Sequence, residues 1–138
     1  RAMNRLREAL AGQGASIAVT SFNRQVLLTG QVPNDAARAR ATEVVRGVPD
    51  VRTVFNELSV SGVTSLTSSA NDAAITASVK TRLLRDERVP GTKIKVKTEA
   101  GVVYLMGLVT HAEAEVATEI ARTTAGVTRV VTLFEYLN

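Results

Sequence analysis

The chain has 138 residues, of which 45% are hydrophobic and 22% charged, so it can build a core and is not a disordered tail. Its net charge of +4 falls short of the concentrated positive charge of a dedicated nucleic-acid-binding protein, and we expect no nucleic-acid partner. Cysteine is absent and there is one histidine, which excludes disulfides, thiol catalysis and metal sites built from cysteine or clustered histidine.

Residues 1–60 predict one small unit with the element order helix, strand, strand, helix, strand. Apolar residues at helical or strand spacing mark the inner face of each element. They are Leu6 and Leu10 in the first helix, Ile17 and Val19 in the first strand, residues 26–32 in the second strand, Ala37, Ala41, Val44 and Val45 in the second helix, and Val51, Val54 and Leu58 in the third strand. Asn34 is the expected N-cap of the second helix, which should end near Gly47. We expect the first helix to be incomplete at Arg1.

Residues 61–69 are uncharged and rich in serine and threonine, which is typical of a linker. Residues 70–138 then repeat the element order of the first unit. We expect Asn71 and Asp72 to cap a helix whose inner stripe is Ile75, Val79 and Leu83. Strands at 94–97 and 102–106 should flank a turn at 99–101, and Thr110 with Glu113 has the spacing of a capping box before the second helix. Residues 127–136 predict the last strand.

The two units are copies of each other. When the sequence is aligned with itself at a shift of 77 residues, apolar and glycine residues match through the two hairpin strands. After one deleted residue the shift becomes 76, and the residues of the second helix and last strand match. Matched pairs include Leu28 with Leu105, Gly30 with Gly107, Val32 with Val109, Thr42 with Thr118 and Arg46 with Arg122. The hairpin should pair antiparallel and the helical crossover should give a parallel, right-handed connection. The fold class is therefore α+β: two tandem units, each a three-stranded mixed sheet with both helices on one face.

This order of elements, with a Val-x-Leu-x-Gly motif ending the second strand, resembles the BON domain. The motif stands at residues 26–30 and again at 103–107, and a Gly-Val-x-x-Val element follows at 126–130. Two tandem copies fill nearly the whole chain, which is similar to the dual-BON outer-membrane lipoproteins. The resemblance implies domains at 1–60 and 70–138.

The same resemblance implies a non-catalytic periplasmic protein without a cofactor. It implies an anchor in the outer membrane through an N-terminal lipidated cysteine outside this sequence. It also implies binding of anionic phospholipids, phosphatidylglycerol and cardiolipin, at the inner leaflet, in support of envelope integrity and at division sites. We expect a monomer. The alternative is a structural module that binds an envelope protein partner.

The resemblance places lipid contact on the first helix of the second domain. Leu84 lies about 140° from the core stripe at about 100° per residue, on the outer side of that helix. Unpaired N–H groups at Asn71 and Asp72 would suit a phosphate, unless the Asp72 carboxylate itself caps the helix. The expected lipid-binding residues are Ser69, Ala70, Asn71, Asp72, Ala73, Ala74, Ala77, Ser78, Lys80, Thr81, Leu84 and Arg85.

Three further features bear on lipid binding and catalysis. Ala74 stands where the family carries a tryptophan, and loss of an interfacial aromatic weakens insertion. The spacing of Lys93, Lys95 and Lys97 predicts one strand face that either supports lipid binding electrostatically or is simply solvated and protects an edge. His111, at the opening of a helix, is expected to be a surface residue rather than a catalyst or a ligand.

Overall fold

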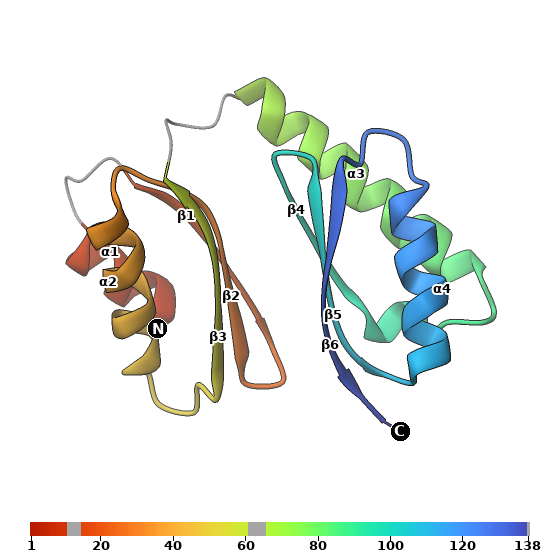
Figure 1. The fold of residues 1–138 in the computed structure, drawn as a ribbon, viewed down its shortest axis with the longest axis horizontal. Coiled ribbons are helices and arrows are strands. Elements are labelled where there is room, and N and C mark those ends of the chain that lie inside the picture. The colour runs from red at the N-terminus through yellow and green to blue at the C-terminus, as the bar shows by residue number, and fades with distance from the viewer. Residues whose placement is uncertain (11–14, 61–65, 138) are drawn as a thin grey trace. The chain divides into compact units, whose positions relative to one another are not determined.

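The computed structural model describes residues 1–10, 15–60 and 66–137, and the chain divides into two compact units, Arg1–Thr64 and Ser65–Asn138. Each unit has the predicted element order (Figure 1). The first unit contains α1 (Ala2–Ala9), β1 (Ser16–Phe22), β2 (Gln25–Val32), α2 (Asp35–Arg46) and β3 (Thr53–Val60). The second contains α3 (Leu66–Arg85), the 3₁₀ turn η1 (Gly91–Lys93), β4 (Lys95–Glu99), β5 (Val102–Val109), α4 (His111–Arg122) and β6 (Arg129–Tyr136).

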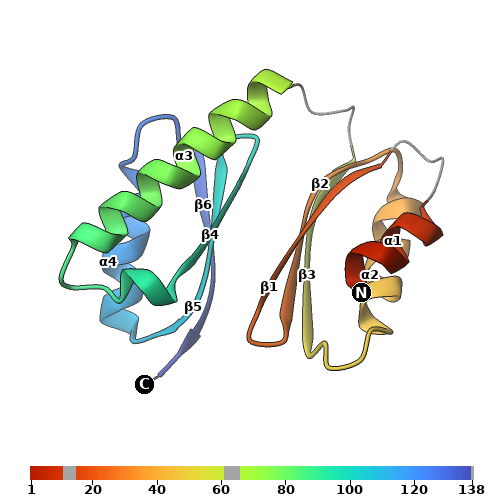
Figure 2. The same cartoon turned by 180° about the vertical axis from the view of Figure 1, so that it is seen from behind.

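Both sheets have the predicted mixed topology. In the first unit β2 is central, antiparallel to β1 and parallel to β3. In the second unit β5 takes the same place between β4 and β6. The two helices of each unit cover a single face of its sheet, as the opposite views show (Figures 1 and 2). The predicted α+β architecture is therefore confirmed.

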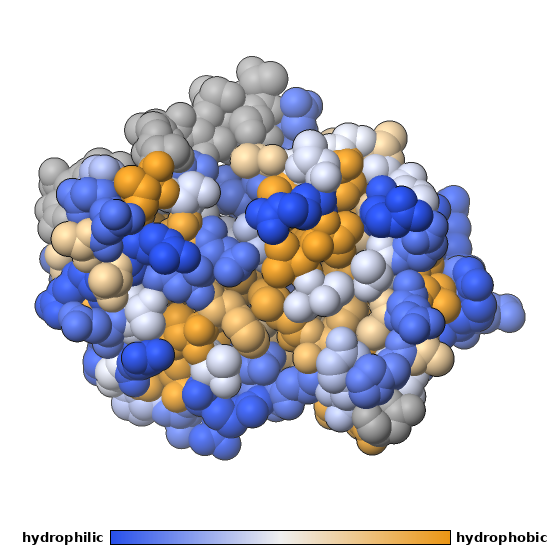
Figure 3. Space-filling view, in the orientation of Figure 1, coloured by the Kyte–Doolittle hydropathy of each residue, from blue (hydrophilic) through white to orange (hydrophobic). Residues whose placement is uncertain are grey.

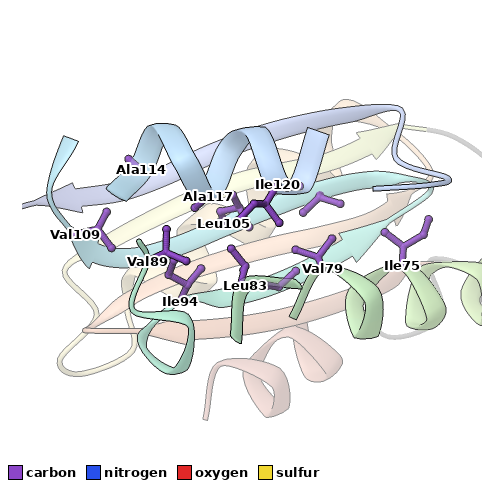
Figure 4. Close-up of a cluster of buried hydrophobic side chains, with 13 residues drawn as sticks. Ile75, Val79, Leu83, Val89, Ile94, Leu105, Val109, Ala114, Ala117 and Ile120 are labelled. Carbon is purple, nitrogen blue, oxygen red and sulfur yellow. The ribbon is translucent and has the colours of Figure 1, made fainter. Parts of the chain in front are cut away.

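Each unit has its own apolar core between the helices and the sheet. In the second unit, side chains from α3 and α4 point toward those of β5, with Val89 and Ile94 closing one end (Figure 4). The predicted stripe Ile75, Val79 and Leu83 lies in this core. Small alanines on the inner faces of α2 and α4 let those helices pack closely on their sheets. The outer sides of α2 and α4 are largely hydrophilic (Figure 3).

The helix caps that the sequence predicts for α2 and α4 are confirmed. The Asn34 side chain accepts a hydrogen bond from the Ala37 N–H at 2.8 Å, as an N-cap does. Thr110 and Glu113 form a reciprocal capping box, with bonds of 3.1 Å and 2.8 Å. These side chains satisfy N–H groups that would otherwise have no partner inside the helix.

Two predicted boundaries in the second unit are wrong. The helix α3 begins at Leu66, before the expected caps at Asn71 and Asp72, so residues 66–69, which were expected in the linker, are helical. Lys93 is not in a strand, because the Lys93 N–H bonds the Pro90 carbonyl at 2.8 Å and closes the turn η1. The strand β4 begins only at Lys95.

Candidate functional site

The outer face of α3, which we define as Ala73, Ala77, Lys80, Thr81 and Leu84, points away from the core of the second unit. Leu84 is 60% exposed, while Ile75, Val79 and Leu83 on the inner side of the helix are buried. The predicted orientation of this helix is therefore confirmed. Apart from Asp72, the side chains expected to contact lipid are all exposed: Ser69, Ala70, Asn71, Ala73, Ala74, Ala77, Ser78, Lys80, Thr81, Leu84 and Arg85.

Asp72 does not cap a helix, and the prediction of a phosphate site at Asn71 and Asp72 is wrong. The helix continues through both residues, so their backbone N–H groups lie inside it. The Asp72 carboxylate is only 7% exposed and accepts hydrogen bonds from the N–H groups of Ala100 at 2.8 Å and Gly101 at 2.9 Å. It therefore fixes α3 to the turn between β4 and β5, where both residues have positive φ, 51° and 80°.

A hollow of about 490 Å³ lies beside this contact, between α3 and two turns of the second unit. Asn71 and Ala74 line it from the helix, and Ala100, Gly101, Ala125 and Gly126 line it from the turns. The contact of these turn residues with the helix was not predicted from the sequence. Their small side chains were the available signal, because small residues at turns leave space beside a neighbouring helix.

The positive charges of α3 fall into two groups. Lys80 and Arg85 are exposed and flank Leu84. Arg82 instead points toward the end of α4, where its guanidinium donates to the Ile120 carbonyl and the Thr124 hydroxyl, both at 2.7 Å. A guanidinium at this position satisfies a carbonyl at the helix C-terminus and complements the negative end of the helix dipole. Arg82 is thus a structural link between α3 and α4.

We expect Arg82→Ala to destabilise the second unit by about 1–2 kcal/mol, because it leaves the Ile120 carbonyl and the Thr124 hydroxyl without their charged donor. Urea denaturation followed by the amide NMR signals of the second unit measures this loss. Arg82→Lys serves as the matched control, since one ammonium cannot reproduce the guanidinium fork and should recover only part of the stability. An Arg82→Ala protein as stable as the wild type would contradict the role of this link.

The turn that follows α3 holds an ion pair of its own. Arg88 donates to the Asp86 carboxylate through its side chain, at 2.7 Å to Oδ2, and through its backbone N–H. These hydrogen bonds lower the pKa of Asp86 to about 2. Arg88 is therefore already neutralised by a neighbour and adds little to the charge that α3 presents.

The strand lysines lie on the side of the sheet that faces away from α3 and α4. Lys95 pairs with Met106 and Lys97 with Tyr104, while the intervening Val96 packs into the core. For Lys95 and Lys97 the predicted face is therefore confirmed, and Lys93 is the exception because it lies in η1. A Cβ added at Gly91 of η1 would lie 2.7 Å from the Leu83 carbonyl oxygen, so η1 adjoins the end of α3.

His111 is exposed, as predicted, and stacks on the Tyr136 ring at a centroid distance of 3.9 Å with the rings nearly parallel. Across residues 1–10, 15–60 and 66–137, no three histidine, aspartate or glutamate side chains are grouped so that they could hold a metal ion. In the same residues, no helix has both the length and the apolar character needed to span a membrane.

Comparison with known proteins agrees with the duplicated fold. The BON domain matches residues 3–62 and again residues 71–138. The chain is 42% identical over 118 residues to the outer membrane lipoprotein DolP of Haemophilus influenzae, covering 86% of this chain and 61% of that protein. It is 33% identical to the 21 kDa hemolysin of Actinobacillus pleuropneumoniae over 136 residues, covering 99% of this chain and 70% of that protein.

A third relative is the osmotically-inducible protein Y of Escherichia coli, 35% identical over 121 residues, with 86% of this chain and 60% of that protein covered. The chain thus spans about 60–70% of the length of these relatives. The two matched regions coincide with the two units of the structure. The chain belongs to the BON-domain family, as a dual-BON member of the DolP family.

Proposed function

We propose that this chain is a non-catalytic periplasmic protein of the cell envelope that binds anionic phospholipid at the inner leaflet of the outer membrane. Support for the location comes from its similarity to a protein named outer membrane lipoprotein. The observation that carries the proposal is the outer face of α3, where Leu84 is exposed beside Lys80, together with the exposed Arg85 that follows Leu84 in the chain. We extend it to a role in envelope integrity and to localisation at division sites.

The residues of this face set the strength of the contact. Full burial of a leucine side chain stabilises by about 1.5–3 kcal/mol, and each cation near an anionic surface adds about 1 kcal/mol. Ala73 and Ala77 allow the helix to approach the headgroups closely. Ala74 supplies no interfacial aromatic ring. The expected contact is weak and reversible, and it suits a protein that a second signal holds at the membrane.

For that second signal we propose a lipidated cysteine N-terminal to this sequence, as the name of the lipoprotein relative suggests. For the strand lysines Lys95 and Lys97 we propose a smaller contribution. Lys95 and Lys97 project from the sheet face opposite α3, since the intervening Val96 packs into the core, so a flat membrane that touches α3 does not touch them. Charges separated by more than about 8 Å of solvent are largely screened at physiological salt. Lys93, in the turn beside the end of α3, is the lysine that we retain as electrostatic support.

Co-sedimentation with vesicles tests the proposal. We expect vesicles of phosphatidylglycerol or cardiolipin to pull down more protein than vesicles of phosphatidylcholine at low salt, and the difference to shrink as salt is added. Equal recovery with anionic and neutral vesicles at low salt would overturn the lipid assignment.

We expect Leu84→Asp to reduce binding to anionic vesicles about 100-fold, because it removes a buried leucine and adds a charge of the same sign as the lipid. The melting temperature should change little, since Leu84 is 60% exposed. Leu137→Asp is the matched control: Leu137 is in the same unit and is also 60% exposed, but it follows β6. Equal losses in the two variants would show that the α3 face is not the lipid contact.

A further inference from the structure

Each sheet has two edge strands, and the one that runs parallel to the central strand is β3 in the first unit and β6 in the second. In the first unit, side chains bond the outward backbone groups of that edge. Arg38 of α2 donates through Nε to the Leu58 carbonyl at 2.9 Å and through Nη2 to the Asn56 carbonyl at 3.0 Å. These two carbonyls point away from β2, where an added strand would have to bond. Arg38 thus occupies the edge of β3.

The Asn56 side chain also bonds the edge of β3. Its Oδ1 accepts a hydrogen bond from the Leu58 N–H at 3.2 Å. Its Nδ2 donates to the Arg38 carbonyl at 2.8 Å and to the Thr42 hydroxyl at 2.7 Å, which holds the side chain in place. The outward carbonyls of Asn56 and Leu58 and the outward N–H of Leu58 are therefore satisfied within the unit, which hinders edge-to-edge pairing at the middle of β3.

The second unit has other residues at the positions of Arg38 and Asn56. The shift of 76 residues that superposes the crossovers places Ala114 at the position of Arg38, Thr132 at that of Asn56 and Phe134 at that of Leu58. The register confirms the match, since Leu58 pairs with Gly30 and Phe134 with Gly107. The methyl group of Ala114 cannot donate a hydrogen bond. Within the part of the chain that the structure describes, no side chain bonds the outward backbone groups of Thr132 or Phe134.

A groove of about 380 Å³ lies between α4 and β6 in the second unit. Ala114, Thr132 and Tyr136 are among the residues that line it, and Tyr136 is 46% exposed beside His111. Glu115 and Glu119 form its charged wall, with Glu119 also paired to Arg122 at 2.6 Å. No lysine or arginine lines the groove. Its walls thus combine an aromatic ring with negative charge.

From these observations we propose that the groove and the edge of β6 bind an extended cationic segment of another protein, which adds as a strand to the sheet. Backbone hydrogen bonds to Thr132 and Phe134 would supply affinity. Alternate side chains of the added strand would enter the groove, where lysine or arginine meets Glu115, since Glu119 is already paired with Arg122. The lipid contact of α3 plays no part in this inference.

An NMR titration of the full chain tests the proposal. The probe is an acetylated and amidated heptapeptide of alternating valine and lysine, with the valine–glutamate heptapeptide as the charge control. We expect the lysine peptide to shift the amide signals of residues 130–136 and of the groove residues of α4, and to slow hydrogen exchange at Thr132 and Phe134. The signals of β3 should stay unchanged. Shifts equal at β3 and β6, no shifts at all, or equal binding of the glutamate peptide would overturn the proposal.

The first unit provides the matched variant. The double variant Ala114→Arg with Thr132→Asn introduces the Arg38 and Asn56 side chains at the matching positions of the second unit. It should weaken peptide binding at least 10-fold and leave vesicle binding unchanged. The reciprocal change, Arg38→Ala with Asn56→Thr, should open β3 and create a second peptide site. If the double variant of the second unit does not fold, the surface substitution Glu115→Lys tests the same groove. We expect it to weaken binding of the lysine peptide at least 5-fold. Undiminished binding in that double variant or in Glu115→Lys would refute the assignment of this edge.

Discussion

Replacing Gly30 with alanine should unfold the first unit. Gly30 lies within β2 at a φ of +120°, which side chains of L-residues rarely adopt. A Cβ at this position would lie 2.0 Å from the Ser16 carbonyl oxygen of the neighbouring strand. Relief of the clash requires the two backbones to separate, at a cost above about 3 kcal/mol. That cost is comparable to the whole stability of a unit of this size, about 3–9 kcal/mol.

Gly107 is the internal control for this substitution, because it occupies the same motif position in the second unit. A Cβ there would lie 3.1 Å from the Lys93 carbonyl, and a displacement of a few tenths of an ångström relieves that contact. We expect Gly107→Ala to cost about 1 kcal/mol. An amide spectrum should show the signals of residues 15–60 collapse in Gly30→Ala but remain in Gly107→Ala. Similar behaviour of the two variants would contradict the distinction.

The second large effect is expected for Asp72→Ala. The variant removes an ionised acceptor from two backbone N–H groups, those of Ala100 and Gly101, in a partly buried turn. Hydrogen bonds to charged groups contribute about 1.5–3 kcal/mol each, and their loss is only partly compensated by water. We expect a destabilisation of about 3 kcal/mol and a fall in the melting temperature of the second unit by about 10–20 °C.

Calorimetry measures the change in stability, and hydrogen exchange at Ala100 and Gly101 locates it. Asp72→Asn is the conservative control, since its amide oxygen retains one acceptor while its NH₂ group faces the other N–H. Its stability should fall between those of the wild type and Asp72→Ala. If Asp72→Ala melted like the wild type, or if exchange at Ala100 and Gly101 stayed slow, the carboxylate would not hold the turn.

Much of the fold could be predicted because its signals are local or repeated. The stripe Ile75, Val79 and Leu83 fixed the inner side of α3, and so the outward direction of Leu84. Side chains three residues from their partners, such as Asn34 and Thr110, were correctly identified as caps. The duplication supported each assignment, since every element of one unit had a counterpart in the other.

The features that could not be predicted depend on partners distant in the sequence. Asp72 satisfies the local pattern of an N-cap, yet its partners lie 28 and 29 residues further along the chain. Arg38 carries no local sign that it bonds β3, because the contact depends on the register of a parallel strand 18–20 residues away. Only coordinates reveal that the copies differ at this edge, and the lipid role of α3 remains a prediction.

The stack of His111 on Tyr136 has a practical consequence for spectroscopy. The protein has two tyrosines and no tryptophan. Tyr136, at the end of β6, is 46% exposed and stacks on the His111 imidazole, so we expect its emission to depend on that contact. We therefore expect Tyr136 to act as an intrinsic optical reporter beside the groove, whose emission changes when a ligand arrives, without any attached dye.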